Sequence, residues 1–242
     1  SVSKFLAAAN GNIYDITTAA SPTSLASGFT SNKWQTVNFL SRTFFANGAD
    51  TMQVFNGSTI AASTFTGVTL STLVGGWQYQ QRLYFWANNS TGFWYAPLNS
   101  ITGALQFYDL APFAPNGGNI VTMTNFTHDG SNGVNDFAVF MLSSGDALVY
   151  FGNDPGLASE WQLVGRFRLA PPISVRAMTT YGGDGFITTY ADHPSMHDIL
   201  TALMEGRLPP RSKASGAVQA ATSANPNGFG WQALYYPNGH FL

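Results

Sequence analysis

The sequence has no cysteine and few charged residues, and both deficits limit what the chain can be. Without cysteine in its 242 residues, the chain can form neither a disulfide framework nor a thiolate metal site, so a small disulfide-rich secreted scaffold is excluded. Charged residues make up only 9%, against roughly 25% in average soluble domains. The formal net charge of −2 argues against a dedicated nucleic-acid binder, which needs clustered cations to displace phosphate counterions.

Long apolar runs are missing as well. No run approaches the roughly 20 residues that span a bilayer, so we expect no membrane-spanning segment. The opening segment SVSKFLAAANGN has a single Lys4 and lacks the charged start of a signal peptide. The last residues, Phe241-Leu242, stand inside a sequence typical of a strand. We therefore expect the chain to be a fragment of a longer protein.

Glycine and aromatic residues, in contrast, are plentiful, with 25 Gly and 14% aromatics. This composition, poor in charge and rich in turn formers, is typical of all-β proteins. The stretch 136–169 predicts a strand, a tight turn at Ser144-Gly145-Asp146, a second strand, a loop with Asp154-Pro155 and a third strand from Trp161. Period-two alternation between Gly and Asp turns indicates an antiparallel meander.

Similar meanders are predicted before this stretch. Asn10-Gly11 lies between two β-prone runs, which is the strongest short hairpin signal, and 18–31 is predicted as a loop. Further strands are expected at 34–39, 41–46, 51–55 and 64–73, then at 77–86, 92–98 and 104–110. After the 136–169 stretch, 176–190 begins another unit, in which Tyr181-Gly-Gly-Asp-Gly185 is a hairpin turn.

These units recur at a regular spacing. Trp34, Trp77 and Ile120 follow one another at 43-residue intervals, and Arg42 and Arg82 lie 40 apart, whereas the next interval, from Ile120 to Arg176, is longer at 56 residues. Recurrence near 40–50 residues with four short strands per unit indicates β-propeller blades, because one sheet cannot bury both of its faces alone. A β-sandwich of unrelated hairpins is the other interpretation. We expect blades over 1–192, a small helical insertion over 193–224, and strands resuming the propeller over 225–242.

The acidic residues are the candidates for catalysis. Paired carboxylates hydrolyse glycosides in many enzymes, and Asp146 and Asp154 are the candidates here. Both lie in predicted turns, where Asp is favoured because it caps local backbone N–H groups. The loop 128–136 resembles a calcium loop but lacks its D-x-D-x-D-G frame and terminal Glu. We therefore expect no enzymatic activity, cofactor or metal.

The basic residues are candidates for contacts. Arg166 and Arg168 occupy alternate positions of one strand and so share a face. They are either solvated surface charges or, since Arg is enriched at interfaces, contacts to another subunit or to DNA. The full set of candidate contact residues is Arg166, Arg168, Arg176, Arg207, Arg211 and Lys213.

The segment 152–189, GNDPGLASEWQLVGRFRLAPPISVRAMTTYGGDGFITT, carries a family resemblance. It resembles the tail-hub or nozzle proteins of short-tailed bacteriophages and prophages, also called packaged-DNA stabilisation proteins. The common features are Asp154-Pro155, Trp161, Leu163-Val164-Gly165, Arg168, Pro172, Arg176 and Gly183-Asp184. Segments 34–50, 80–105 and 129–152 extend the similarity, whereas Ala170 and Ser174 stand where glycines would be expected.

The resemblance implies a structural rather than a chemical function. Such proteins are β-propellers that assemble, commonly as hexamers, into the channel below the portal of the virion. The ring retains the genome and passes it out at infection. We therefore expect a homo-oligomeric tail protein, assembled in the bacterial host cytoplasm, that contacts other tail or portal-adaptor proteins and DNA in transit. The rival interpretation is a carbohydrate-binding or glycoside-cleaving β-propeller, which the many Trp and Tyr side chains would suit.

Overall fold

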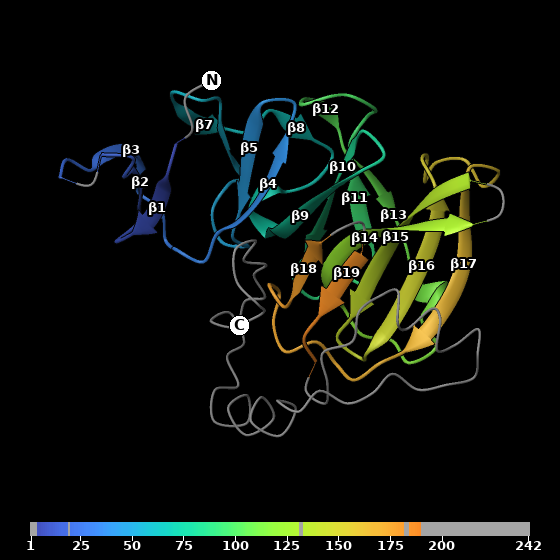
Figure 1. The fold of residues 1–242 in the computed structure, drawn as a ribbon. Helices are drawn as coiled ribbons and strands as arrows, with labels where there is room; N and C mark the ends of the chain where they lie inside the picture. Colours follow the sequence, from blue (N-terminus) through green and yellow to red (C-terminus); the bar gives the residue numbers. More distant parts are fainter. Residues whose placement is uncertain (1–3, 19, 131–132, 182–183, 190–242) are drawn as a thin grey trace. The chain divides into compact units, whose positions relative to one another are not determined.

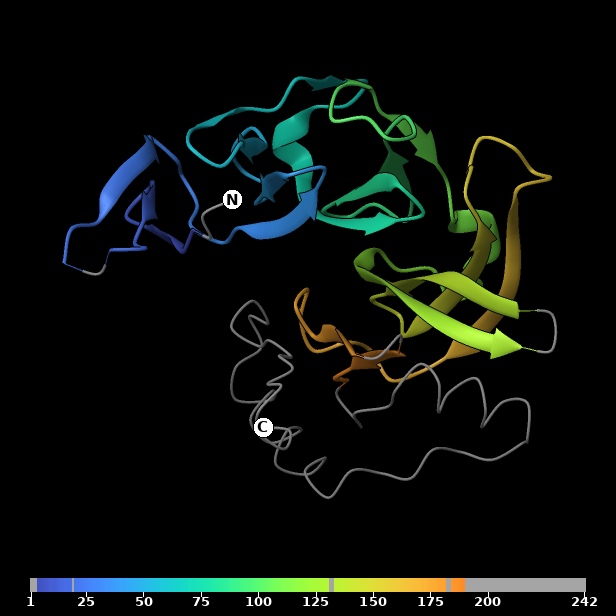
Figure 2. The same ribbon diagram turned by 45° about the horizontal axis from the view of Figure 1, so that its top comes forward.

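The chain divides into two units, Ser1–Tyr108 and Asp109–Leu242. The computed structural model describes residues 4–18, 20–130, 133–181 and 184–189 (Figures 1 and 2). These residues form antiparallel sheets and one short parallel strand pair, and their helical content is limited to two 3-10 turns, η1 (Leu70–Thr72) and η2 (Ala111–Phe113). No helix in this part of the chain is long and apolar enough to cross a membrane. The helical insertion predicted for 193–224 and the strands predicted for 225–242 lie outside the described residues.

The first sheet of unit 1 contains three strands, β1 (Leu6–Ala9), β2 (Asn12–Asp15) and β3 (Thr23–Ser27). The predicted Asn10-Gly11 hairpin is confirmed. The prediction of a loop over 18–31 is wrong, since β3 pairs antiparallel with β2. The sequence TSLAS has no run of large β-formers, and its strand conformation comes from pairing along the edge of β2 rather than from intrinsic propensity.

The second sheet has four consecutive strands, β4 (Gln35–Phe39), β5 (Arg42–Ala46), β6 (Gln53–Phe55) and β7 (Ile60–Ala62). The first three confirm the predicted strands. The fourth strand expected at 64–73 is wrong, because Asn56-Gly57 turns the chain directly into β7. The segment that was predicted as a strand instead contains the short β8 (Phe65–Thr66), η1 and the first residue of β9.

The third sheet has the order β13-β11-β10-β9. Its strands are β9 (Leu73–Tyr79), β10 (Arg82–Ala87), β11 (Phe93–Tyr95) and β13 (Gln106–Tyr108), and β12 (Gly103–Ala104) pairs in parallel with β8. The single strand predicted over 77–86 is wrong, since Gln80-Gln81 turns the chain between β9 and β10. Glutamine is not a turn signal, so nothing in the local sequence indicates this reversal.

Unit 2 contains the four-stranded meander that the sequence predicted most clearly. Its strands are β14 (Ile120–Gly130), β15 (Gly133–Leu142), β16 (Asp146–Gly152) and β17 (Trp161–Arg168). The turn before Asp146, the loop at Asp154-Pro155 and the strand from Trp161 are confirmed. Two further strands, β18 (Met178–Tyr181) and β19 (Asp184–Ile187), pair antiparallel on either side of the predicted turn, whose residues 182–183 lie outside the described part of the chain.

Within each unit, neighbouring sheets bury their faces against one another. In unit 1, Phe44 of the second sheet and Phe85 of the third pack around Phe65, with ring centroids 5.7 to 6.3 Å apart. The opposite face of the second sheet contributes Phe45 to a core with Ile13 of the first sheet. The second sheet is thus covered on both faces by its neighbours, as propeller blades are.

Within each unit, the first strand of one sheet lies next to strands of the following sheet. In unit 1, β4 packs beside β9, and in unit 2, β14 packs beside β18 and β19. Because the strands pair mainly as antiparallel meanders and neighbouring sheets within a unit bury their faces against one another, the described residues form an all-β, propeller-like series of repeats. This confirms the predicted fold class for the described residues.

Candidate functional site

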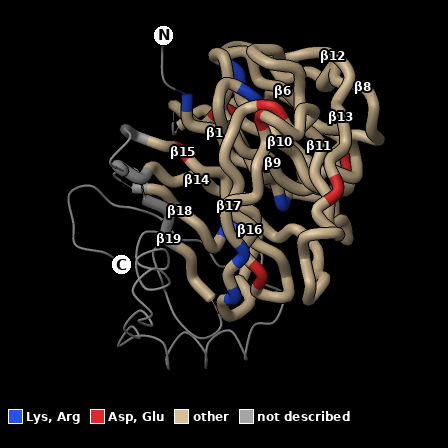
Figure 3. The backbone as a smooth tube through the Cα atoms, turned by 90° about the vertical axis from the view of Figure 1, so that its right-hand side faces the viewer, with Lys and Arg blue, Asp and Glu red and all other residues tan. Residues whose placement is uncertain are grey.

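The predicted basic contact residues Arg166 and Arg168 lie on β17, an edge strand of its sheet (Figure 3). Exposed and half-buried positions alternate along β17. Both arginines project from the exposed side together with Val164, which is 56% exposed. The expectation that the two arginines share a strand face is confirmed.

Arg168 is the arginine whose charge is partly neutralised. Its guanidinium lies 3.4 Å from Oδ1 of Asp146, the residue opposite it on β16. Asp146 is only 4% exposed and also accepts hydrogen bonds from Asn116, at 3.2 Å from the backbone N–H and 2.8 Å from Nδ2. These contacts fasten the segment before β14 to the start of β16, so Asp146 has a structural role.

Arg176 is the third predicted basic residue that lies in the described part of the chain. Arg176 precedes β18 and donates its backbone N–H to Oγ of Ser174 at 3.0 Å. Burial lowers the pKa of its guanidinium, although arginine stays protonated in proteins. The remaining predicted residues, Arg207, Arg211 and Lys213, lie outside the described part of the chain.

The two acids considered for glycoside hydrolysis lie at opposite ends of β16. Asp146 is its first residue, and Asp154 follows its last residue, Gly152. At ~3.3 Å per residue, the two ends of β16 are about 20 Å apart, whereas paired catalytic carboxylates lie ~5–9.5 Å apart. Asp154 accepts a hydrogen bond from the backbone N–H of Gly156 at 3.0 Å, as expected for a turn residue. These two acids cannot act as a catalytic pair.

The segment compared with a calcium loop, 128–136, is mostly strand. β14 runs to Gly130 and β15 begins at Gly133. Asp136 accepts a 3.0 Å hydrogen bond from Nδ2 of Asn125 on the paired strand, and burial raises the pKa of its carboxyl. Among the described residues, no three His, Asp or Glu side chains gather as metal ligands would.

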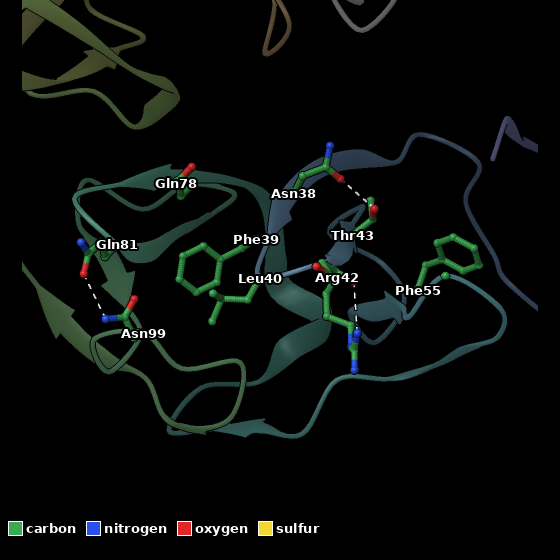
Figure 4. A pocket seen from close by; sticks show the side chains of 11 residues that line it. Asn38, Phe39, Leu40, Arg42, Thr43, Phe55, Gln78, Gln81 and Asn99 are labelled. Atoms are coloured by element: carbon green, nitrogen blue, oxygen red, sulfur yellow. Dashed lines mark hydrogen bonds between the residues drawn. The ribbon is translucent and has the colours of Figure 1, made fainter. Parts of the chain in front are cut away.

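A concave site that sequence reasoning missed lies in unit 1 (Figure 4). A cavity of about 530 Å³ opens where the β4–β5 and β9–β10 turns meet the turn at Asn99. Side-chain amides and one cation line it, together with partly covered apolar groups. The polar residues are Asn38, Gln78, Gln81, Asn99 and Arg42, and the apolar ones are Phe39, Leu40 and Phe55.

Two turns at the rim have an uncommon backbone conformation. Leu40 and Ser41 have φ of 45° and 58°, and Gln80 and Gln81 have 45° and 59°. Two-residue hairpin turns of type I′ require positive φ at both positions and therefore favour Asn-Gly. Outside glycine, each such residue costs of order 1 kcal/mol or more. Backbone strain of this kind collects at functional sites.

Hydrogen bonds fix the polar groups of the cavity. Asn99 donates its backbone N–H to the carbonyl of Gln81 at 2.9 Å and its Nδ2 to Oε1 of Gln81 at 3.0 Å. On the other side, Oγ1 of Thr43 donates to Oδ1 of Asn38 at 2.7 Å, and Figure 4 shows both pairs. The cavity rim is thus braced before any ligand arrives.

Arg42 is the one charged side chain among the described residues that line the cavity. It is half-buried, and its guanidinium donates to the carbonyl oxygen of the adjacent Ser41 at 3.1 Å. Among the described ion pairs, none neutralises Arg42. Leu40 is 51% exposed beside it, whereas Phe39 and Phe55 are below 10%. The cavity therefore combines an unneutralised cation, an exposed aliphatic side chain and hydrogen-bonding amides.

Sequence reasoning noted Arg42 and Arg82 as a repeat but could not assign them different roles. Arg82 is 7% exposed, donates to the carbonyl of Ala96 at 2.8 Å and lies 5.4 Å above the ring of Tyr95. Arg82 is therefore a core residue, while Arg42 faces the cavity. The spacing of the two arginines indicated a repeat and did not indicate the cavity.

Neither a protein-family model nor a curated protein matches the chain. Two solved structures align with most of it. One is BBS1N in complex with ARL6DN, soaked with lead, at 18% identity and a TM-score of 0.49, covering 78% of this chain and 58% of that one. The other is the computationally designed Ika8 protein, at 11% identity and a TM-score of 0.49, covering 81% and 55%. The chain thus spans less than two thirds of either protein, and these likenesses carry no argument about function.

Proposed function

We propose that the protein is a non-enzymatic structural component of a phage tail, a hub or nozzle subunit. Copies assemble into a ring in the bacterial host cytoplasm and become part of the virion. The ring forms part of the DNA channel below the portal, where it retains the genome and then passes it out. Its partners are further copies of itself, other tail or portal-adaptor proteins and DNA in transit.

The observation that carries this proposal is the resemblance of the segment 152–189 to tail-hub proteins. In the structure, three residues of this segment serve turns and packing. Asp154 caps the loop at Gly156, Trp161 opens β17 and stacks on Tyr150 with ring centroids 5.0 Å apart, and Arg168 pairs with Asp146. Side chains that serve the architecture of the sheet support a structural role better than a catalytic one.

The scarcity of charge supports the same role. With 9% charged residues and a net charge of −2, the chain offers few cations to hold phosphates (Figure 3). A channel through which DNA slides needs weak phosphate contacts, because tight ones would arrest the genome. The rival glycoside-cleaving function needs two carboxylates close together, but Asp146 and Asp154 lie at opposite ends of β16.

Duplex DNA binding tests this proposal. Fluorescence anisotropy of a labelled 30-base-pair duplex at about 150 mM salt should give a Kd in or above the non-specific range of ~10⁻⁶–10⁻⁴ M. Nanomolar binding at that salt would contradict passage through a sliding channel. Hydrolysis of a glycan by the purified chain, lost in Asp146→Asn or Asp154→Asn, would instead establish the rival function.

A further inference from the structure

The loop between β16 and β17 carries an exposed carboxylate and an exposed aliphatic side chain. These two groups complement the cation and the exposed aliphatic side chain of the unit 1 cavity. Leu157, at its tip, is 50% exposed, and Glu160 ends the loop as an exposed residue. The Glu160 carboxylate has no ion-pair partner among the described residues. Asp154 is the loop's other acid, but it already accepts the Gly156 N–H. The loop therefore presents one aliphatic side chain and one available carboxylate.

This loop is held in a single conformation by its own backbone. The N–H of Leu157 donates to the carbonyl of Asp154 at 3.1 Å, and that of Glu160 donates to the carbonyl of Leu157 at 2.9 Å. At the base, the N–H of Asn153 donates to the carbonyl of Glu160 at 3.2 Å. A preorganised loop loses little conformational entropy on binding. The loop and the cavity are therefore both preorganised for binding.

We propose that the 153–160 loop of one copy docks into the Arg42 cavity of the next copy. Glu160 pairs with Arg42, Leu157 lies against Leu40, and the cavity amides meet polar groups of the loop backbone. This inference rests on the proposed ring-forming function and names the contact that builds the ring. Because donor and acceptor are different surfaces of one chain, the contact is head-to-tail, and head-to-tail contacts close into rings when the rotation allows.

The chemistry of the cavity favours a protein loop over a sugar. Sugar rings stack on exposed aromatic faces, but Phe39 and Phe55 are only 8% and 7% exposed. The exposed apolar group at the cavity is Leu40, an aliphatic side chain that suits another aliphatic side chain. A half-buried guanidinium without an acid partner, facing a carboxylate without a basic partner, supplies the charge complementarity that sets register in interfaces.

The contact is an anchor rather than a whole interface. Stable interfaces bury ~1,200–2,000 Å², more than one eight-residue loop supplies. A few central residues nevertheless carry most of the binding energy. Reversing one charge of the pair should therefore weaken assembly on the order of 100-fold or more, since like charges facing each other cost several factors of ten in affinity.

Charge reversal followed by mixing tests the contact. The masses of wild type, Arg42→Glu and Glu160→Arg are measured by light scattering over a range of concentrations. Each variant alone should be monomeric at concentrations where the wild type assembles. A 1:1 mixture of the two should assemble again, because alternating copies of the two variants bring opposite charges together at every junction. Lys33→Glu, an exposed charge reversal in unit 1 away from the cavity, should assemble as the wild type does.

The outcomes separate this inference from the function beneath it. If the wild type assembles and both reversed variants assemble equally well, the loop-in-cavity contact is wrong while the ring-forming function stands. If the variants fail to assemble but the mixture is not rescued, the contact is also wrong. If the wild type stays monomeric at every concentration, the ring-forming function itself is contradicted. Thermal unfolding of each variant, expected within a few degrees of wild type, confirms that it is folded.

Discussion

The Asn10-Gly11 turn and the Leu40-Ser41 turn have the same backbone conformation but different residues. Both join paired strands through two residues of positive φ, at 50° and 72° in the first and 45° and 58° in the second. Asn-Gly is the pair that this conformation favours, and Leu-Ser is not. The difference lies in what surrounds each turn.

The first turn is covered by chain. Gly11 donates its N–H to Oδ1 of Asn32 at 3.0 Å, and its carbonyl accepts the N–H of Phe29 at 3.0 Å. A Cβ at Gly11 would lie 2.6 Å from the carbonyl oxygen of Phe29. The covering segment is held in turn by Asp50, whose carboxylate accepts hydrogen bonds from Thr30, Ser31 and Asn47.

The second turn is open and borders the cavity. Leu40 is 51% exposed there, so neither burial nor the backbone requires a leucine. A leucine at a strained and exposed position indicates a role for its side chain, because strain persists at sites where function needs it. One turn is thus built for the fold and the other for the cavity.

The largest expected effect on stability comes from adding a side chain at Gly11, in the turn that is covered by neighbouring chain. Gly11→Ala should lower the free energy of unfolding by about 3 kcal/mol, because the new Cβ adds a clash with Phe29 to the cost of positive φ. Gly28→Ala is the matched control: φ is +86° there with no atom within 4 Å of a Cβ, so only about 1 kcal/mol should be lost. Equal losses in denaturant titrations of the two variants would show that the cover is not tight.

The second-largest effect is expected from removing the side chain that holds the segment covering the Asn10-Gly11 turn. Asp50→Ala should cost about 2 kcal/mol, since it removes charge-assisted hydrogen bonds to the 30–31 segment. Burial raises the pKa of Asp50, but the hydrogen bonds from Thr30, Asn47 and Ser31 outweigh burial and lower the pKa overall. The carboxylate therefore stabilises the fold above the pKa of an unfolded Asp, near 3.9, and this contribution is lost as the pH falls through the folded pKa.

The pH dependence of the stability lost in Asp50→Ala shows whether the loss comes from hydrogen bonds to the ionised carboxylate or from packing of the side chain. The stability difference between wild type and variant should be constant near neutral pH and shrink below about pH 4. Urea titrations at pH 7 and pH 3 measure it. A stability difference of the same size at both pH values would contradict stabilisation by the ionised Asp50 carboxylate.

A smaller effect of opposite sign is expected at the open turn. Replacing Leu40-Ser41 by Asn-Gly should raise the free energy of unfolding by about 1–2 kcal/mol, because the favoured residues relieve the positive-φ strain. The same variant should assemble less well, since the cavity loses its exposed aliphatic side chain. A variant that is neither stabilised nor weakened in assembly would remove the contrast between the two turns.

The smallest effect is expected at the other rim turn. Replacing Gln80-Gln81 by Asn-Gly relieves similar strain but loses the hydrogen bond between Oε1 of Gln81 and Nδ2 of Asn99. The net gain should be about 0.5–1 kcal/mol, since a typical intramolecular hydrogen bond contributes ~1 kcal/mol. In thermal unfolding, the variant with Asn-Gly in place of Leu40-Ser41 should have a higher midpoint temperature than the variant with Asn-Gly in place of Gln80-Gln81. The reverse order would contradict the bracing role of Asn99.

The same contrast explains what the sequence could predict. The Asn10-Gly11 hairpin and the turn at Ser144-Gly145-Asp146 were predictable, because their residues are the ones their backbone conformations favour. The Gln80-Gln81 reversal was not, because tertiary pairing of β9 with β10 imposes its positive φ against local preference. β3 was missed for a similar reason, since its strand conformation comes from pairing with β2.

The candidate site was the least predictable part. Arg166 and Arg168 were correctly placed on one face because alternation along a strand is local. The cavity gathers Asn38, Gln78 and Asn99 from separate hairpins, and no spacing in the sequence indicates that these hairpins meet at one end. The acids Asp146 and Asp154 were recognised as turn residues from their neighbours, and the length of β16 then separated them.

The mass of the purified chain in solution tests the central claim most directly. Light scattering over a wide concentration range, with electron microscopy of the same sample, should show a closed ring of several copies around an opening wide enough for duplex DNA. A chain that remains monomeric at every concentration, or that forms a closed particle without an axial opening, would contradict the assignment as a channel-forming tail protein.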